Sequence, residues 1–423
     1  MPLRSTSPSH SAHRPGREWV PALLITVAVV GASCSLGARP PGSSAPPVLG
    51  QPSRTSVAVG QPAPAGTGEL SAVSCADAEH CWAVGVPGPN APPTTATTGA
   101  AATATPAVTG TTVIAATVNG GRTWTTQPLT PGTTPPALTG VSCPGAKVCM
   151  AVGSTGADPG TGVVLTTQNG GKSWAPSVPP AGSIAVTSVK CTTAADCTVV
   201  ASDGTADWSA VTSNFGQTWL RQGTLPAGMG GELTLSCASA GTCLVAGFTP
   251  TTAGHGQGAL ALSTNGGMTW ISATVPPGVG LLRSAACTSS TSCLAAGTTS
   301  TTVSDVVPAK GLLLGSSNGG MTWSASPDPP AVDDAFGVAC PTSTSCAMVG
   351  TNWVGTPVIG TGAVAESRDA GATFTPSTTA YTPLTLTALA CPTAVACVAV
   401  GGDTMARITL PPPRARPRGA TST

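Results

Sequence analysis

Cysteine is the residue whose spacing points most directly to chemistry in this chain. Fourteen of the fifteen cysteines fall into seven pairs, and every pair has the same C-x5-C spacing. Zinc ligation does not fit, because the four histidines are scattered and the spacing differs from that of common zinc sites. Disulfide formation does fit, so we expect an extracytoplasmic protein in an oxidising compartment. The predicted pairs are Cys75/Cys81, Cys143/Cys149, Cys191/Cys197, Cys237/Cys243, Cys287/Cys293, Cys340/Cys346 and Cys391/Cys397.

The remaining cysteine, Cys34, ends a segment that has the features of an export signal. Three arginines precede the apolar run 20–32, which is shorter than the ~20 residues of a membrane span and suits a signal peptide. The sequence GASC at 31–34 is similar to the processing site of bacterial lipoproteins, in which a lipid is attached to the cysteine. We expect membrane association through a lipid on Cys34. Ordinary cleavage nearby and an uncleaved anchor are the alternatives.

An eight-residue motif that occurs six times is the second feature of the sequence whose residue types could bind a ligand. Each copy holds at least two hydroxyls, an Asn or Asp, glycine and an aromatic ring, which could form a ligand loop or only a turn. The Asn or Asp can accept a backbone N–H two residues on, as in an Asx-turn, and the following Gly supplies a positive φ. Calcium is disfavoured, because five copies carry Asn where a hard cation prefers a carboxylate. The copies are TVNGGRTW (117–124), TQNGGKSW (167–174), TSNFGQTW (212–219), STNGGMTW (263–270), SSNGGMTW (316–323) and SRDAGATF (367–374).

The cysteine pairs and this motif recur in step, with a period of about 50 residues. In each period one strand ends at the first cysteine, a second begins at the second cysteine, a third runs into the motif and a fourth leaves it. Four hairpin-linked strands per repeat predict an all-β propeller of four-stranded antiparallel blades, with one hairpin disulfide per blade. Small residues three positions before each first cysteine place that strand near a crowded axis: Ala72, Gly140, Ser188, Thr234, Ser284, Gly337 and Ala388.

Seven cysteine pairs predict seven blades, with six or eight as alternatives. The last repeat lacks the motif, and we expect TSVAVG (55–60) to supply its fourth strand, because closing the ring with both termini removes exposed sheet edges. The predicted organisation is a signal segment at 1–34, a Pro/Gly/Ser-rich linker at 35–54, the propeller at 55–410 with a low-complexity insertion at 86–110, and a disordered basic tail at 411–423.

Composition and motif content exclude several function classes. Only 8% of residues are charged and the net charge is +1, so there is no electrostatic footprint for nucleic acid. The chain contains no G-x-S-x-G, P-loop or H-E-x-x-H motif. We therefore expect a monomer with no nucleic-acid partner, no cofactor and no bound metal. The Thr/Pro/Ala-rich, lysine-poor composition is typical of a high-GC bacterium.

The eight-residue motif resembles the Asp-box, or BNR repeat, of sialidase-like β-propellers, and SRDAGATF is the fullest match. The copies span residues 117–374, and the repeat units extend to about 410. The resemblance implies that the motif forms turns at the blade periphery, away from a central site. The residues at the acidic and aromatic positions are Asn119, Trp124, Asn169, Trp174, Asn214, Trp219, Asn265, Trp270, Asn318, Trp323, Asp369 and Phe374.

Sialidase-like glycoside hydrolysis is the catalytic alternative that this resemblance implies. That chemistry uses a Tyr nucleophile, an acid/base Asp and an Arg cluster. The chain has one tyrosine, Tyr381, and the family's N-terminal Arg motif is absent. Arg283 lies on an inner strand, where it either faces the axis or is a lone exposed side chain. Glu232, Asp333 and Asp334 are candidate acids without a paired spacing.

The hypothesis that we favour is a non-catalytic propeller that binds or scaffolds a protein or glycan of the cell envelope. Propeller faces commonly recruit such partners, and the fold alone does not name them. Photosystem II assembly factors share this repeat type. They imply a basic patch and a photosynthetic host, and the sequence indicates neither.

Overall fold

Seven β-sheets make up the part of the chain that the computed structural model describes. That part comprises residues 56–57, 61–64, 67–86, 114–129, 136–155, 160–239, 241–252, 255–302, 309–326, 332–354, 359–377 and 385–410. All of it belongs to one unit, Gln51–Thr423. The predicted segments 1–34, 35–54 and 411–423 lie outside the described residues, as does the insertion 86–110 apart from Val86. In these ranges, no helix has the length and apolarity needed to span a membrane.

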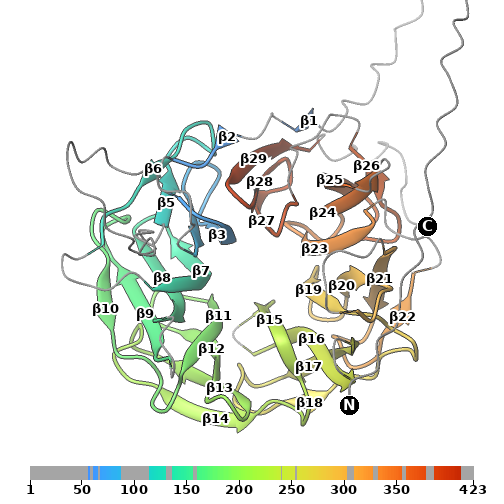
Figure 1. Cartoon of the computed structure of the whole chain (residues 1–423), viewed down its shortest axis with the longest axis horizontal. Helices are drawn as coiled ribbons and strands as arrows, with labels where there is room; N and C mark the ends of the chain where they lie inside the picture. The colour runs from blue at the N-terminus through green and yellow to red at the C-terminus, as the bar shows by residue number, and fades with distance from the viewer. Residues whose placement is uncertain are drawn as a thin grey trace, which may run out of the picture. The chain divides into compact units, whose positions relative to one another are not determined.

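Each sheet is a blade of antiparallel strands, and within Gln51–Thr423 the blades follow one another around a ring (Figure 1). In blades 1 to 6 the four strands pair in chain order, and the first strand is the inner one. Their bounds are β3 (Leu70–Cys75), β4 (Cys81–Gly85), β5 (Ile114–Thr117) and β6 (Thr125–Thr126) in blade 1; β7 (Ala137–Gly145), β8 (Val148–Ser154), β9 (Gly162–Thr167) and β10 (Ala175–Ser177) in blade 2; and β11 (Ala185–Cys191), β12 (Cys197–Ser202), β13 (Asp207–Thr212) and β14 (Leu220–Thr224) in blade 3.

Blades 4 to 6 repeat this arrangement. Their strands are β15 (Gly230–Cys237), β16 (Cys243–Thr252), β17 (His255–Ser263) and β18 (Ile271–Ser272) in blade 4; β19 (Leu282–Cys287), β20 (Cys293–Thr298), β21 (Gly311–Ser316) and β22 (Ser324–Ala325) in blade 5; and β23 (Asp334–Ala339), β24 (Cys346–Val354), β25 (Ile359–Ser367) and β26 (Thr375–Pro376) in blade 6.

Blade 7 is built from both ends of the described chain. Its first three strands are β27 (Ala388–Thr393), β28 (Ala396–Gly401) and β29 (Thr404–Thr409), and its outer positions are taken by β1 (Ser56–Val57) and β2 (Gln61–Pro62). Both short strands pair antiparallel with β29, with Val57 opposite Ile408 and Gln61 opposite Met405. The predicted seven blades and their closure by the segment 55–60 are therefore confirmed.

The hydrophobic core is divided among the junctions between neighbouring blades. Trp82 of blade 1, for example, packs with Leu138 and Trp174 of blade 2. A further cluster joins Leu70 of blade 1 to Met405 of blade 7 and so completes the ring. Because both faces of a blade are covered in this way, the second strands read as continuous apolar runs such as CWAVG, in which every residue is buried.

All seven predicted disulfides are present, one in the hairpin between the first and second strands of each blade. In blade 3 the bridged residues Cys191 and Cys197 lie directly opposite each other, with a Cα–Cα separation of 3.9 Å. In the chain-entropy model, closing so short a loop stabilises the fold by about 2 kcal/mol. The disulfides act within blades, so the contacts between blades must come from other groups.

The prediction that each second strand begins at the second cysteine is wrong for Cys149 and Cys397. Strands β8 and β28 each begin one residue before that cysteine, and β7 and β27 run two residues past the first cysteine of the pair. In both hairpins the register shifts at the first cysteine, so two residues of the first strand face one of the second, as in a β-bulge. This shift lets strand pairing continue into the C-x5-C loop. Both cysteines still form their predicted disulfides, Cys143–Cys149 and Cys391–Cys397, and the added strand pairs are Gly145–Val148 and Thr393–Ala396.

Serine and threonine hydroxyls bridge the inner parts of neighbouring blades at each junction of the described ring. Ser142 Oγ accepts the N–H of Cys191 at 2.9 Å, and Thr234 Oγ1 donates to the carbonyl of Arg283 at 2.7 Å. Several of these hydroxyls belong to the small residues three positions before the first cysteines. This position is crowded from two sides: a Cβ on Gly140 would lie 3.1 Å from Val152 of its own blade and 3.4 Å from the backbone N of Val189 in the next. The other bridges are Ser74–Cys143, Thr139–Val186, Ser188–Leu235, Ser284–Val338, Thr351–Thr385 and Thr387–Leu70.

Removing the N-terminal strands should weaken the whole ring. A chain that begins at residue 64 lacks β1, β2 and the hydrogen bond from Ala63 N–H to the carbonyl of Asp403, and it leaves β29 as an open edge. We expect it to lose a few kcal/mol of unfolding free energy, at about 1 kcal/mol per lost hydrogen bond, and to self-associate. Urea unfolding and light scattering measure both effects. A chain that begins at residue 51 is the control, and equal behaviour of the two would contradict this role of β1 and β2.

Candidate binding site in the central channel

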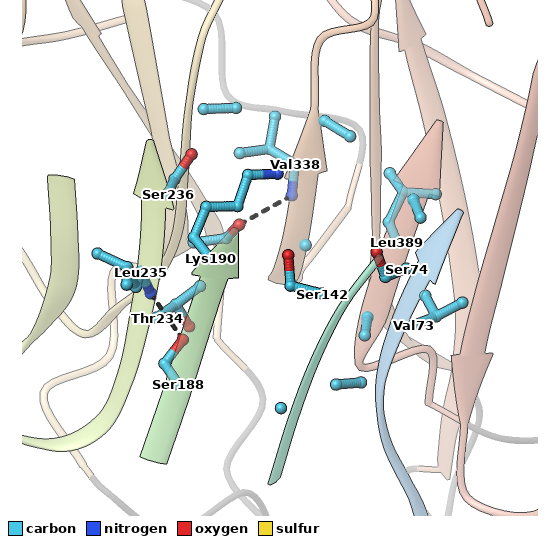
Figure 2. A pocket seen from close by; sticks show the side chains of 18 of the residues that line it. Val73, Ser74, Ser142, Ser188, Lys190, Thr234, Leu235, Ser236, Val338 and Leu389 are labelled. Carbon is cyan, nitrogen blue, oxygen red and sulfur yellow. Dashed lines mark hydrogen bonds between the residues drawn. The ribbon is translucent and has the colours of Figure 1, made fainter. Parts of the chain in front are cut away.

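Two connected cavities lie between the inner strands β3, β7, β11, β15, β19, β23 and β27. One, of about 670 Å³, lies where these strands begin, and we call it the arginine mouth after Arg283. The other, of about 500 Å³, lies where they end at the first cysteines, and we call it the cysteine mouth (Figure 2). Thr139, Thr187 and Phe336 line both, so the two cavities form one channel.

Arg283, on β19, is held on three sides in the arginine mouth. Its Nε lies 3.4 Å from Oδ1 of Asp334 on β23, and its Nη1 lies 3.4 Å from Oε2 of Glu232 on β15. Its Cζ lies 4.3 Å from the centre of the Phe336 ring, a cation–π contact. The Arg283 side chain is only 11% exposed. The structure thus overturns the alternative of a lone exposed arginine and brings together three charged residues from three blades.

Apolar and hydroxyl side chains surround this charged group. Phe336, Trp353 and Leu233 provide aromatic and aliphatic surface, while Thr139 and Thr187 provide hydroxyls. The Glu232 side chain is 81% exposed, so its carboxylate remains accessible from solvent while it contacts Arg283. An apolar surface with charges of both signs beside it can hold an extended peptide, whose side chains and backbone need both kinds of contact.

The candidate acids separate into two roles. Glu232 and Asp334 both contact Arg283, although no paired spacing in the sequence connects them. Asp333 has a local role instead: its Oδ2 accepts the N–H of Trp353 at 2.9 Å, and its own N–H donates to Asn352. Tyr381 lies outside the described residues, so its role as the nucleophile of the sialidase-like alternative stays a prediction. Within the described ranges, no group of three or more His, Cys, Asp or Glu residues is placed to hold a metal ion.

The cysteine mouth contains a lysine that the sequence interpretation did not single out. Lys190, on β11, is the only charged residue among those that line this cavity, and Figure 2 shows its side chain extending into the space between the strands. Burial lowers the pKa of Lys190 below the ordinary lysine value. A comparison of the repeats at the position directly before the first cysteine would have singled out Lys190, because no other blade has a charged residue there. The equivalent residues are Ser74, Ser142, Ser236, Ala286, Ala339 and Ala390.

The eight-residue motif forms the turn between the third and fourth strands of blades 1 to 6. The turn lies beside the disulfide hairpin, because the second cysteine of each pair is directly opposite the turn's first hydroxyl residue, as Cys243 is to Ser263. In addition, the N–H of the turn's fourth residue donates to a carbonyl of the C-x5-C loop. In blade 4 this bond runs from Gly266 to Gly241 at 2.8 Å.

Hydrogen bonds within the turn differ in one respect from the predicted Asx-turn. Asn265 Oδ1 accepts the hydroxyl of Ser263 at 2.9 Å and the N–H of Thr269, four residues on rather than two, at 2.9 Å. Its Nδ2 donates to the Thr269 hydroxyl at 2.8 Å. The positive φ predicted for the following glycine is present, and Phe215 and Ala370 adopt it too, at 56° and 62°. These two residues are in the left-handed region without being glycine, so the side-chain bonds of the turn must hold them there.

Each turn also packs against the blade before it. Gly216 of blade 3 has a φ of 81°, and a Cβ there would lie 3.1 Å from Cε of Met150 in blade 2, so glycine suits both the backbone and the close contact. The aromatic residue of the turn also contacts the preceding blade. In blade 4, Trp270 Nε1 donates to Ser209 Oγ of blade 3 at 2.9 Å. The motif therefore builds the fold and takes no part in the channel.

The fold and the channel together define the class of protein as a seven-bladed β-propeller. No protein-family model matches the chain, and no curated protein matches its sequence. Solved structures do resemble it.

A structure of YCF48 bound to a D1 peptide is 14% identical, with a TM-score of 0.56 over 85% of this chain and 97% of that one. YCF48 from Cyanidioschyzon merolae is 15% identical, with a TM-score of 0.54 over 85% and 99%. The GH74 xyloglucanase from Xanthomonas campestris is 13% identical, with a TM-score of 0.55 over 83% of this chain and 53% of that one. Identities this low show a shared fold and nothing more.

Substitutions at Asn265 should separate the two functions of its amide. Asn265→Ala removes three hydrogen bonds, and we expect it to cost about 1–3 kcal/mol of unfolding free energy. Asn265→Asp keeps both bonds to Oδ1, and its second oxygen can accept the Thr269 hydroxyl as Asp369 Oδ2 accepts that of Thr373. We expect Asn265→Asp to lie within about 0.5 kcal/mol of the parent at neutral pH. Equal losses in urea unfolding would contradict this account.

Asp369 should make the turn of blade 6 sensitive to acid. Partial burial raises the pKa of Asp369, but hydrogen bonds from Thr373 and Ser367 outweigh burial and leave the pKa below its ordinary value. A lowered pKa in the folded state means that the carboxylate stabilises the fold at neutral pH and that this contribution is lost on acidification below about pH 4. We expect Asp369→Asn to flatten the acid limb of the melting-temperature profile. An unchanged limb would refute this assignment.

Proposed function

We propose that this propeller is a non-catalytic binding module that holds a segment of another protein at the arginine mouth, outside the cytoplasm. The observation that carries the proposal is the composition of that mouth. Arg283 and Glu232 line a cavity of about 670 Å³ together with aromatic and aliphatic surface, and Asp334 pairs with Arg283 behind them. None of these groups is arranged as a nucleophile beside a general base.

The structural neighbours support binding of a peptide. YCF48, which has the same fold over nearly its full length, has been seen bound to a D1 peptide. In this chain, an extended segment at the arginine mouth would meet Phe336 and Trp353 with apolar side chains and Glu232 with a basic one. A complementary partner is therefore a protein segment that carries a hydrophobic residue close to a lysine or arginine.

Location outside the cytoplasm is supported by the disulfides, because seven of them persist only in an oxidising compartment. We further propose that 1–34 is a signal segment with a lipid attached at Cys34 and that 35–54 links this anchor to the propeller at 55–410. The hydroxyl–Asn–Gly hydrogen bonds of the six turns support their membership of the Asp-box repeat.

Sialidase-like hydrolysis is the second candidate, and the GH74 xyloglucanase shows that a similar fold can belong to a glycoside hydrolase. The geometry favours it less. Arg283 is engaged by Asp334 and Glu232, whereas a substrate carboxylate would need a guanidinium free to bind it. A fluorogenic sialoside provides the direct test, and turnover that disappears in Tyr381→Phe would replace the binding proposal with this one.

Photo-crosslinking tests the proposed binding surface. A benzoylphenylalanine placed at Glu232 should form a discrete protein adduct in envelope fractions of the source organism, and Phe336→Ala should reduce its yield at least fivefold by removing the apolar surface. The matched control is the same crosslinker at Lys172, an exposed residue of the blade 2 turn. Melting temperatures check that each variant is folded. Equal adducts from both positions, or no adduct from position 232, would overturn the proposal.

A further inference from the structure

The cysteine mouth has chemistry of its own, which the proposed function does not use. Its lining contains one cation, Lys190, and no acidic residue within the described part of the chain. The hydroxyls of Ser142 and Ser236 come from the blades on either side of Lys190. Across the channel, blades 5, 6 and 7 present Ala286, Ala339 and Ala390 at the equivalent position. The cavity is therefore polar and cationic on one side and apolar on the other.

Lys190 occupies a position at which two of the other blades use a serine hydroxyl to bridge to the next blade. Ser74 and Ser142 each accept the N–H of the first cysteine in the next blade, at 3.0 Å and 2.9 Å. A protonated lysine has no lone pair and cannot accept such a bond. Among the described residues the ammonium of Lys190 makes no hydrogen bond or ion pair, and it extends into the cavity instead. The other six blades have serine or alanine at this position, so Lys190 alone places a charge there, and that charge forms no ion pair among the described residues that would stabilise the fold.

From this arrangement we propose that the cysteine mouth binds the carboxylate of a small organic acid or of a chain terminus, with Lys190 as its counter-ion and an apolar group against the alanine side. One ammonium matches one carboxylate in charge, and the Ser236 hydroxyl is free to donate to it. A phosphate is a poorer match, because the cavity has no arginine and no second cation to balance a second negative charge. This site does not rest on the proposed function, since it uses different residues at the other end of the channel.

The cost of desolvating Lys190 supports the same assignment. Burial lowers its pKa, so the folded state disfavours the ammonium relative to the unfolded state. A carboxylate in the cavity would restore the missing counter-charge. Lys190→Met, which removes the charge and keeps the length of the side chain, should therefore melt at the same temperature as the parent or higher.

Calorimetric titration of the full chain with hexanoate and with hexanamide tests the proposal. Hexanoate should bind and hexanamide should bind at least tenfold more weakly, because only the acid carries the charge. Lys190→Met should lower the affinity for hexanoate at least tenfold, and Ser236→Ala several-fold. Lys172→Met, which removes an exposed lysine outside the channel, should leave the affinity unchanged.

A pair of pentapeptides ending in leucine, one with a free carboxylate and one amidated, distinguishes the sources of the ligand. Binding of the free peptide but not of hexanoate would assign the site to a chain terminus, and the reverse would assign it to a free acid; both support the carboxylate site. The proposal is overturned if neither acid binds, if the amides bind equally well, or if Lys190→Met binds as the parent does. Loss of crosslinking at Glu232 would leave these results unaffected, so the two proposals fail separately.

Discussion

A blade of this propeller has two apolar faces, and each face can be buried only by a neighbouring blade. That constraint governs the rest of the structure. It divides the core among the junctions, so that Trp82 belongs as much to blade 2 as to its own blade. It also explains why the ring must close: without β1 and β2, blade 7 would keep an open edge at β29. The hydroxyl bridges between inner strands follow too, because backbone groups at the junctions are shielded from water and need a partner.

The disulfide and the eight-residue turn share one period because they are two parts of one structure. The hairpin cysteine lies opposite the turn's first hydroxyl, and a hydrogen bond from the turn's fourth N–H joins the two loops. The turn then packs its second glycine and its aromatic ring on the previous blade. The disulfide thus constrains the hairpin to which the turn is hydrogen-bonded, and the turn itself contacts the preceding blade. The recurrence of cysteine pairs and Asn–Gly turns, which could have indicated a ligand site, is therefore explained by packing between blades.

The sequence predicted those features whose causes are local. C-x5-C spacing, the Asn–Gly turn and the apolar second strands each depend on residues within one blade, and so they indicated the strands, the disulfides and the blade count. Contacts between residues of different repeats could not be predicted in this way. Glu232, Arg283 and Asp334 lie in three successive blades, and only the ring brings them together. The Asx-turn prediction named the correct acceptor, Asn265, but the wrong donor. The N–H that it accepts belongs to Thr269, four residues on, because the chain folds back over the side chain there.

Strand ends were the least predictable feature within a blade. The same C-x5-C spacing gives a second strand that begins at the cysteine in blade 3 but one residue before Cys149 and Cys397 in blades 2 and 7. Spacing fixes which cysteines can meet, whereas the register of the residues between them decides where pairing stops. A bulge in the first strand changes that register without moving the disulfide, so the bridge could be predicted and the strand end could not.

Function in such a ring should reside where the repeats are free to differ. Junction positions are held to small, hydroxyl-bearing or apolar residues by the neighbouring blade. Channel positions vary more, although Thr139 and Thr387 also bond to the next blade. Four positions before the first cysteine the blades have Ser71, Thr139, Thr187, Leu233, Arg283, Phe336 and Thr387. The same holds at the other end, where one blade has Lys190 and the other blades have serine or alanine. Because the junctions supply the stability, the channel can carry a half-buried cation, Lys190, and the buried Arg283–Asp334 ion pair, which a single small core could not easily tolerate.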